Sequence, residues 1–389
     1  MFTNRSLGTV AVAFLLTGLA SSATDQNTQA TKRTINRIFV DVMGQGVPGA
    51  AVLVRRNGHT VFQHGYGVRD LKIRAAIDTQ TNFRLASCTK QFTAMAIMLL
   101  VHDGKLRYDE RLTDVFPDFP AYGNQITIRN LLNHTSGLPD YEDLMDQVSA
   151  GNAPRWTEAR QIQDDEVLAL LKKQNSGKFI PGTQWSYSNS GYVTLGLIVA
   201  KVSHTRFDEF LHERIFHPLK MDHTLAYMRD ENEVPKRAYG HTKVDKAFGQ
   251  TDQSSTSATL GDGGVYSNLE DLARWDDALT HHKLLSEAEM RTALEPVKLS
   301  DKSHPRWASG PGDSDPQAGK PVSYGFGWFL DSYQGHPRMW HYGDTVGFKT
   351  AIERFTKDNL TVIVLCNRSD LDAGAIALKV ANASFGASK

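Results

Sequence analysis

The stretch AAVLVRRNGHTVFQHGY, Ala50–Tyr66, sets the architecture of this chain. Its two halves are rich in strand-forming residues. Asn57-Gly58 between them is a dipeptide that favours a two-residue turn, because both of its positions accept a positive φ. We therefore expect a β-hairpin near the N-terminus. A helix beginning near Ile35 precedes it, since apolar residues recur there at helical spacing.

The tail of the chain repeats this pattern. Thr350–Phe355 and Leu360–Leu365 are strand-like, they flank Asp358-Asn359, and a closing helix follows. Strands at both ends of the chain predict an α+β fold: an antiparallel sheet flanked by helices, built from both termini, with a mainly helical insertion domain. We place the sheet domain at residues 35–80 plus 265–389 and the mainly helical domain at residues 81–264.

Two apolar segments in the middle of the chain support a helical insertion. Phe92–Val101 is apolar on nearly all sides of a helix that ends near Gly104, so we expect this helix to be buried. Tyr192–Val202 predicts a second, largely apolar helix. Residues 296–322 are rich in Pro, Gly, Ser and Asp and predict a long loop.

The composition excludes several classes of protein. Of the 389 residues, 40% are hydrophobic and 22% are charged, which is typical of a globular chain and not of a disordered or fibrous one. Lys and Arg total 43, and Asp and Glu total 43, so the formal net charge is zero. That balance provides no general attraction for nucleic acid or for an anionic membrane surface. We therefore expect a small-molecule partner in a cleft, and no nucleic acid.

The N-terminus has the features of an export signal. Arg5 precedes the short apolar run Leu7–Ala20, and small residues follow it, as a signal peptidase requires. We predict a cleaved signal peptide over residues 1–23 and a flexible linker over residues 24–34. The run is too short to span a bilayer comfortably, so we expect no stable membrane anchor after cleavage. The mature protein is then secreted or periplasmic in a bacterium, and an uncleaved anchor is the alternative.

Cysteine and histidine patterns indicate neither a disulfide framework nor a metal site. Because Cys88 and Cys366 are the only cysteines, we expect two buried thiols, with a bridge between them as the alternative. His281-His282 lacks a third ligand at metal spacing, and no His-Glu-x-x-His helix occurs. We predict no metal and no organic cofactor.

The sharpest chemical signal is Ser87-Cys88-Thr89-Lys90 at the start of the first apolar helix. A three-residue step puts Ser87 and Lys90 on one helical face, within reach of each other. Burial disfavours the lysine cation, so we expect a lowered pKa that lets Lys90 take the proton of Ser87. The helix N-terminus favours the anion formed in acyl transfer. The structural alternative is a helix cap beside a lysine that extends to solvent.

A second element, Tyr187-Ser188-Asn189, precedes the second apolar helix. Tyr187 can relay a proton if neighbouring cations lower its pKa, and Asn189 can hold a substrate carbonyl while contacting Lys90. Taken alone, this segment is more typical of a turn whose tyrosine packs on the core.

A third element, His341-Tyr342-Gly343, opens a C-terminal strand. If that strand passes Ser87, the backbone N–H groups of Ser87 and Asp344 form an oxyanion hole. Gly343 then lets the substrate approach the backbone closely. Taken alone, this segment is more typical of the start of a buried, aromatic-rich strand.

The order and spacing of the three elements carry a family resemblance. With Ser87/Lys90, Tyr187/Asn189 and His341/Gly343 in this order, the chain resembles the penicillin-binding-protein-like serine hydrolases. That superfamily includes class C β-lactamases, D-alanyl-D-alanine carboxypeptidases, D-aminopeptidases and family VIII esterases. The likeness runs from about residue 31 to the end and includes the stretches Leu131–Leu138 (LLNHTSGL), Gly263–Ser267 (GGVYS) and Tyr324–Trp328 (YGFGW).

The resemblance implies an active site in the cleft between a sheet domain and a mainly helical domain. Carried over residue by residue, it makes Ser87 the acylated nucleophile, Lys90 its proton acceptor and Tyr187 the proton shuttle. It makes Asn189 the residue that orients Lys90 and the substrate amide, and it places His341 on the opposite wall.

The differences from the family pattern help to decide which group of the superfamily the chain resembles most. Class C β-lactamases have Lys-Thr-Gly at the third element, where this chain has His341-Tyr342-Gly343. A lysine is a permanent cation that attracts the β-lactam carboxylate, whereas a histidine is only partly charged near pH 7, and the bulk of Tyr342 is expected to narrow the cleft. These differences favour carboxypeptidase- and esterase-like members. We interpret His134 and Ser136, in the His-Thr-Ser-Gly stretch, as structural.

We therefore predict an exported serine hydrolase that forms an acyl-enzyme on Ser87. Its expected substrate is an ester or a D-alanyl-type peptide or amide, such as a peptidoglycan-type peptide. Two alternatives stay open: a β-lactamase, which shares the first half-reaction, and a non-catalytic protein that binds muropeptides or another partner. A pure binder has no need for Ser87, Lys90 and Tyr187 together. Specificity is expected in loops near residues 143–180 and 296–322.

Overall fold

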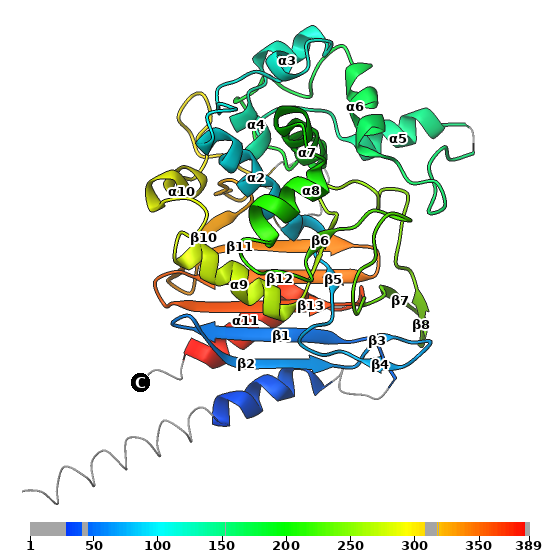
Figure 1. The fold of residues 1–389 in the computed structure, drawn as a ribbon, viewed down its shortest axis with the longest axis vertical. Coiled ribbons are helices and arrows are strands. Elements are labelled where there is room, and N and C mark those ends of the chain that lie inside the picture. Colours follow the sequence, from blue (N-terminus) through cyan, green and yellow to red (C-terminus); the bar gives the residue numbers. More distant parts are fainter. Residues whose placement is uncertain (1–28, 41–45, 152, 308–316, 318, 386–389) are drawn as a thin grey trace, which may run out of the picture.

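The computed structural model describes residues 29–40, 46–151, 153–307, 317 and 319–385. Its main sheet is antiparallel and has six strands (Figure 1). The strand order is β10-β11-β12-β13-β1-β2. These strands are β1 (Ala50–Arg56), β2 (His59–Tyr66), β10 (Phe329–Tyr333), β11 (His336–Thr345), β12 (Phe348–Phe355) and β13 (Leu360–Cys366). Because β1 pairs with β13, with Ala50 opposite Cys366, the two ends of the chain form one sheet, as predicted. The predicted signal peptide, residues 1–23, lies outside the described residues.

Both hairpin turns lie where the sequence predicts them. Asn57 and Gly58 have φ values of 51° and 77°, the left-handed values that a type I′ turn needs. Between β12 and β13, Asn359 has a φ of 46°. Turn chemistry of this kind sets the register of the paired strands, and the register decides which side chains face the core.

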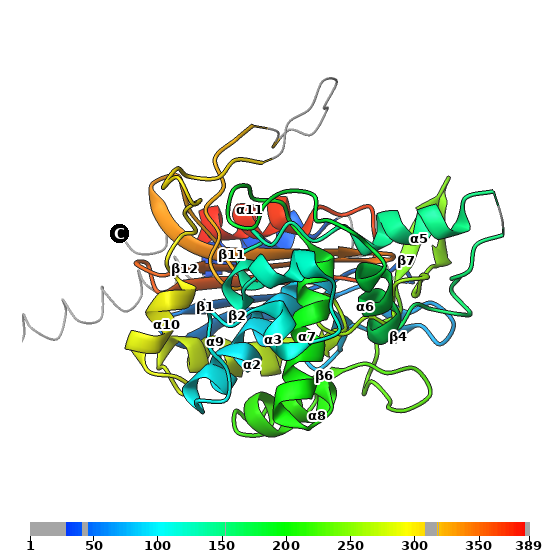
Figure 2. The ribbon, with the colours of Figure 1, turned by 90° about the horizontal axis from the view of Figure 1, so that it is seen from above.

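Helices cover both faces of this sheet (Figure 2). One face carries α11 (Ala373–Phe385) and a helix over residues 29–38. On the other face, α9 (Leu269–Thr280) contacts β1, and α2 (Lys90–His102) lies farther from the sheet. The fold is therefore the predicted α+β arrangement of an antiparallel sheet between helices.

The first helix begins earlier than predicted. Residues 29–34, which we assigned to a flexible linker, are helical, and residues 24–28 of that linker lie outside the described part. Ile35 and Phe39 are buried, and the ring of Phe39 stacks on Tyr66 with centroids 4.6 Å apart. These apolar anchors hold the helix on the sheet while its polar first turns face solvent, so composition alone was misleading there.

The middle of the chain is mainly helical. Its helices are α3 (Leu112–Val115), α4 (Ile128–Leu132), α5 (Tyr141–Ser149), α6 (Asp164–Lys172), α7 (Asn189–Ser203) and α8 (Phe207–Leu211), with α10 (Glu287–Ala293) after α9. Short helical turns are η2 (Ala86–Thr89), η3 (Ala121–Gln125) and η4 (His212–Phe216). As predicted, α2 is buried on nearly all sides and ends before Gly104, whose φ is +70°. It packs against α7, the second apolar helix.

Small sheets connect the helical part to the main sheet. They are β3 (Val68–Asp70) with β4 (Ala75–Ala76), β5 (Phe83–Arg84) with β9 (Val265–Ser267) and β6 (Leu225–Ala226), and β7 (His241–Val244) with β8 (Ala247–Gln250). The β7–β8 hairpin belongs to the segment that we assigned to the helical domain. This hairpin nevertheless contacts the segment between β13 and α11 of the sheet domain, because the N–H of Ser369 donates a hydrogen bond to the carbonyl of His241 at 3.0 Å. The domain boundaries themselves stay a prediction.

The two cysteines are buried, free thiols, Cys88 in η2 and Cys366 at the end of β13, as expected. Within the described ranges, no helix has the length and hydropathy that a bilayer crossing requires.

A buried ion-pair network fastens α9 to the sheet. Asp276 of α9 accepts hydrogen bonds from Arg354 of β12 (Nε, 2.7 Å) and Thr361 of β13 (Oγ1, 2.8 Å). Its second oxygen lies 3.1 Å from Nη1 of Arg55 in β1. All four side chains are buried, so each charge relies on the others in place of water.

We predict that Asp276→Asn destabilises the protein by about 3 kcal/mol, because it leaves Arg354 and part of Arg55 buried without their counter-ion. Urea denaturation measures the change. The matched control is Asp109→Asn, whose exposed pair with Arg107 contributes less than about 1 kcal/mol. Equal urea midpoints for the two variants would contradict the stabilising role of the buried ion-pair network.

Candidate active site

Ser87 lies on a sharp bend between strand and helix. Ala86 has a φ of +47°, a left-handed value that is uncommon for a residue with a side chain, and it turns the chain from β5 into η2. The N–H of Leu85 is fixed by the carbonyl of Val265 at 2.8 Å. The bend presents Ser87, which is partly exposed, at the start of the helix that continues into α2.

Lys90 is fully buried and meets three acceptors. Its Nζ lies 3.0 Å from Oγ of Ser87, 2.9 Å from Oδ1 of Asn189 and 3.0 Å from the carbonyl oxygen of Asp262. Burial lowers the pKa of Lys90 to about 8, against a smaller opposing effect of Asp262. The predicted contact and the predicted direction of the shift are both present, and the structural alternative of a solvent-reaching lysine is excluded.

Tyr187 is placed beside this pair. It borders the same cavity as Ser87, and Nζ of Lys90 lies 4.9 Å from the centre of its ring. Burial raises the pKa of Tyr187 well above its usual value. The lowered pKa on which the sequence made a proton relay by Tyr187 conditional is absent, because the loss of water around the phenolate outweighs the lowering effect of Ser87. Tyr187 is therefore a neutral phenol that can donate or pass on a proton.

Asn189 is held by the start of α7. Ser188 caps this helix by accepting the N–H of Gly191 at 3.0 Å, and the N–H of Ser188 donates to Nδ1 of His134 at 3.1 Å. His134 is fully buried, and its ring lies 4.4 Å from that of Tyr187. The structure thus supports a structural part for His134, which orients the segment that carries Tyr187 and Asn189.

Ser136, the other residue of that stretch, serves the backbone. Its hydroxyl accepts a hydrogen bond from the N–H of Leu138 at 3.3 Å. This local contact agrees with a structural part for Ser136 as well.

His341 lies on the opposite wall, as the resemblance implies. Its Nδ1 is 2.7 Å from the carbonyl of Tyr342, so Nδ1 carries the proton, and Nε2 accepts from the hydroxyl of Tyr324 at 3.2 Å. Burial, followed by the charge of Lys90, lowers the pKa of His341 to about 3. The partial charge that we expected near pH 7 is therefore wrong: His341 is neutral, and it offers no cation to a substrate carboxylate.

Gly343 has a different role from the predicted one. A Cβ placed on Gly343 would lie 2.1 Å from the carbonyl oxygen of Leu85, so the missing side chain lets β11 contact the segment that leads to Ser87. The close neighbour is the protein's own backbone, and not a substrate. Thr350 strengthens the contact by donating from Oγ1 to the same carbonyl at 2.9 Å.

Tyr342 and Asp344 lie on the face of β11 opposite His341. The hydroxyl of Tyr342 donates to Glu353 at 2.6 Å, and its ring packs on Gly374 of α11. The ring thus packs against α11, and it also borders the large cavity onto which Ser87 opens, so our expectation that its bulk narrows the cleft stays a prediction. The carboxylate of Asp344 is exposed and pairs with Lys349. That its backbone N–H completes an oxyanion hole stays a prediction.

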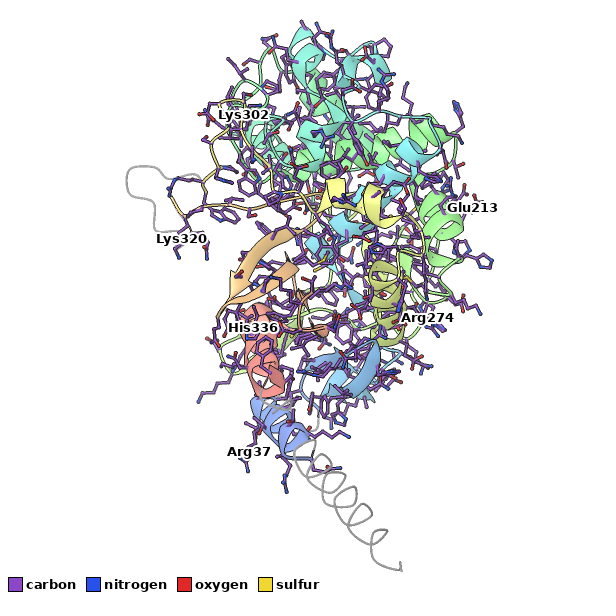
Figure 3. The ribbon with its side chains drawn as sticks, turned by 90° about the vertical axis from the view of Figure 1, so that its left-hand side faces the viewer. Arg37, Glu213, Arg274, Lys302, Lys320 and His336 are labelled. Atoms are coloured by element: carbon purple, nitrogen blue, oxygen red, sulfur yellow. The ribbon has the colours of Figure 1, made fainter. Side chains whose placement is uncertain are left out.

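Two cavities of different character meet at Ser87. The larger, about 930 Å³, is bordered by Tyr187 and His341 and by an aromatic group of Trp307, Phe329 and Trp340. The smaller, about 60 Å³, is bordered by Asn189 and by polar side chains. Residues of the predicted loop 296–322 line the larger cavity, whereas residues 143–180 line neither. Figure 3 shows Lys302 and Lys320 of this loop on the side of the molecule that carries His336 of β11.

Two functional neighbours were missed from the sequence. Asp262 acts on Lys90 through its backbone carbonyl, which any residue type supplies, so no sequence signal marks it. Tyr324 holds His341 and was visible only as part of a stretch shared with the resembled family. Among the described residues, no three His, Cys, Asp or Glu side chains gather as a metal site would require.

We predict that kcat/KM for a neutral ester rises about tenfold per pH unit below pH 8 and levels off above it, because Lys90 must lose its proton before it can accept that of Ser87. Initial rates between pH 6 and 10 test this. The pKa values of His341 and Tyr187 lie outside that pH interval, so neither residue adds a second change of slope to the pH profile of kcat/KM. A flat profile from pH 6 to 9 would rule out Lys90 as the base.

We predict that Gly343→Ala lowers kcat/KM by at least about 100-fold, because the methyl group pushes β11 away from Leu85 and displaces the segment that carries Ser87. Gly249→Ala in β8 is the matched control, since a Cβ there meets nothing within 4 Å. Melting temperatures separate lost activity from lost folding. Wild-type rates for a folded Gly343→Ala protein would show that the close contact is dispensable.

Comparisons with known proteins agree with this geometry. The family model described as Beta-lactamase matches residues 35–385. Penicillin-binding protein 4* of Bacillus subtilis is 31% identical over 332 residues, which cover 82% of this chain and 68% of that protein. D-aminopeptidase of Brucella ovis is 26% identical over 339 residues, 87% of this chain and 60% of that protein. This chain thus spans about two thirds or less of these relatives' lengths.

A solved structure shows the same fold. The D-amino acid amidase from Ochrobactrum anthropi SV3, complexed with L-phenylalanine amide, superposes with a TM-score of 0.75 at 25% identity, over 92% of this chain and 99% of that one. The match of the family model over most of the chain, together with the placement of Ser87 and Lys90, gives one conclusion. This chain belongs to the beta-lactamase family, and it is an enzyme, a serine hydrolase.

Proposed function

We propose that this protein is an exported hydrolase that forms an acyl-enzyme on Ser87 and cleaves amides, short peptides or esters of the D-amino acid type. The observation that carries the proposal is the buried amine of Lys90, 3.0 Å from the Ser87 hydroxyl. The names of the relatives, a D-aminopeptidase and a D-amino acid amidase, support the substrate class. The apolar run Leu7–Ala20 supports export.

In the proposed acylation step, four residues take part: Ser87, Lys90, Tyr187 and Asp344. Neutral Lys90 takes the proton of Ser87 as Oγ bonds to the substrate carbonyl carbon, and the resulting oxyanion is bound by the N–H groups of Ser87 and Asp344. When the tetrahedral intermediate collapses, the bond to the leaving group breaks. Tyr187 gives its proton to that group and regains one from Lys90. The products of this half-reaction are the Ser87 ester, the free amine or alcohol, and neutral Lys90.

Deacylation reverses the roles. A water molecule loses its proton to Lys90 and attacks the ester carbonyl, and Ser87 recovers a proton as the acid is released. No step needs a cation on the opposite wall, where His341 is neutral. This neutrality argues against efficient β-lactam turnover, since a β-lactam carboxylate finds no permanent charge at His341.

We predict that excess benzylpenicillin gives a lasting mass adduct on the wild-type protein and none on Ser87→Ala, and that D-alanine amides or esters are turned over by the wild type alone. Intact mass and product release measure both results, and the mass of exported protein shows whether residues 1–23 are removed.

Other outcomes would contradict the proposal. Steady penicillin consumption with a fleeting adduct would make the protein a β-lactamase. Substrate binding without an adduct or turnover, unchanged in Ser87→Ala, would make it a non-catalytic binding protein.

A further inference from the structure

The segment 261–265 is attached to one side of α2 by hydrogen bonds. Oγ1 of Thr93 donates to the carbonyl of Gly261 at 2.6 Å, and Nζ of Lys90 donates to the carbonyl of Asp262 at 3.0 Å. The backbone of Asp262 is therefore fixed against the catalytic amine, whereas its side chain takes no part in these contacts.

The side chain of Asp262 lacks a hydrogen-bond donor. It is 6% exposed, and its Oδ2 accepts a hydrogen bond from the hydroxyl of Tyr141 at 3.3 Å. Its Oδ1 is buried and receives no hydrogen bond from any described residue that donates in its usual protonation state. Arg84 borders the same small cavity, but its Nε and Nη2 donate to the carbonyls of Gly263 and Ser257. A buried carboxylate oxygen without a donor is costly, so a further donor is needed at Oδ1.

A second carboxyl group, that of Asp164, contacts the same loop. Asp164 is the first residue of α6, and its Oδ1 accepts the N–H of Leu260 at 3.1 Å. Burial, followed by the charge of Asp262, raises the pKa of Asp164 to about 8, so Asp164 holds a proton at neutral pH. Two neighbouring carboxyl groups ionise one at a time, because the first negative charge repels the second. A protonated Asp164 can then supply the donor that Asp262 lacks.

The cations near Asp164 are engaged elsewhere. Asp164 borders a cavity of about 500 Å³ that shares no lining residue with the two active-site cavities. Arg160 and Arg229 border it too, but Arg160 lies 2.8 Å from Glu166, and Arg229 donates to the carbonyl of Glu158 at 2.8 Å. The other charged residues that border this cavity or the small one are acidic: Asp165, Asp230, Glu231, Glu142 and Asp344. A shared proton is therefore the way in which the two carboxyl groups avoid repulsion.

Asp262 also acts on the charge of Lys90. Burial lowers the pKa of Lys90, and Asp262 has the largest effect among the charges that oppose this shift. The other groups that raise this pKa have smaller effects: Cys88, Glu142 and Asp140. The remaining titratable neighbours of Lys90 are uncharged at neutral pH: His134, His341, Tyr187 and Tyr192. The charge of Asp262 thus keeps Lys90 a stronger base than burial alone would allow.

We propose that Asp164 and Asp262 form a carboxylic acid–carboxylate pair that shares one proton, and that this pair positions Asp262 against Lys90. The carboxyl O–H of Asp164 donates to Oδ1 of Asp262, so both oxygens of Asp262 have donors and the pair keeps one negative charge. That charge maintains the basicity with which Lys90 accepts the proton of Ser87. The effect on Lys90 rests on the proposed function, whereas the carboxyl pair itself does not.

The pH dependence of stability tests the carboxyl pair. Because the pKa of Asp164 is raised in the folded protein, its proton stabilises the fold at low pH, and this stabilisation is lost as the pH rises to about 8. In Asp164→Asn the amide NH₂ donates at every pH. From pH 4 to 8 we expect the unfolding constant of the wild type, relative to that of Asp164→Asn, to rise about tenfold per pH unit in urea denaturation. The matched control is Asp165→Asn, an exposed neighbour on the same cavity, which keeps the wild-type pH dependence.

The pH profile of kcat/KM for a neutral ester tests the effect on Lys90. Asp262→Asn removes the negative charge and keeps the backbone carbonyl, so we expect the midpoint of the profile to fall by about one pH unit from its wild-type value near 8. Asp165→Asn is again the control and keeps the wild-type midpoint. A purely structural part for Asp262 would lower the plateau without moving the midpoint. Asp262→Ala, which also removes the charge, is the second variant if the asparagine protein does not fold.

The outcomes distinguish this inference from the proposed function. Equal pH dependences of stability in the wild type and Asp164→Asn would overturn the shared proton, whatever the activity. An unchanged midpoint in a folded Asp262 variant would overturn its action on Lys90. Absence of turnover and of any Ser87 adduct in the wild type would overturn the proposed function, and the urea comparison would still decide whether the carboxyl pair exists.

Discussion

The site depends on the hydrogen bonds of the fully buried amine of Lys90. Its three donors need three acceptors, and Ser87, Asn189 and Asp262 come from three separate segments of the chain. Folding must therefore bring the bend before α2, the start of α7 and the loop before β9 to one point. With a pKa of about 8 in place of its usual 10.5, the protonated amine costs on the order of 3 kcal/mol of stability. That cost is complete below pH 8 and disappears as the pH rises to 10.5, so the site is a place where stability is given up for reactivity.

The main sheet supports this arrangement from the other side. β11 reaches the bend because Gly343 has no side chain to collide with Leu85. The thiol of Cys88 donates to the carbonyl of His341 at 3.3 Å, which adds a second connection between strand and bend. β11 is itself held between β10 and β12, and the sheet continues through β13 to β1. The strand that forms the active-site wall is therefore held in a sheet that contains both ends of the chain. The ion pairs around Asp276 connect α9 to that same sheet.

The features that were predicted correctly from the sequence are those that depend on neighbouring residues along the chain. The turn at Asn57-Gly58, the buried helix α2 and the contact of Ser87 with Lys90 follow from φ preferences and helical spacing, and the structure contains all three. Properties that depend on distant segments were not predictable. The neutral state of His341 and the raised pKa of Tyr187 result from burial by side chains of other segments, such as Tyr324 beside His341 and His134 beside Tyr187. A side chain's own identity does not reveal how much water it loses.

The cleft has two unlike sides, and Ser87 lies where they meet. On the side of His341, burial has removed the charge, and Trp307, Phe329 and Trp340 provide apolar surface. His341 itself therefore offers no cation to an anionic substrate, whereas class C β-lactamases have a lysine at the third element. On the side of Asn189 the wall is polar and carries carboxylates. The two sides therefore offer a bound molecule surfaces of different character, one largely aromatic and one polar, with Ser87 between them.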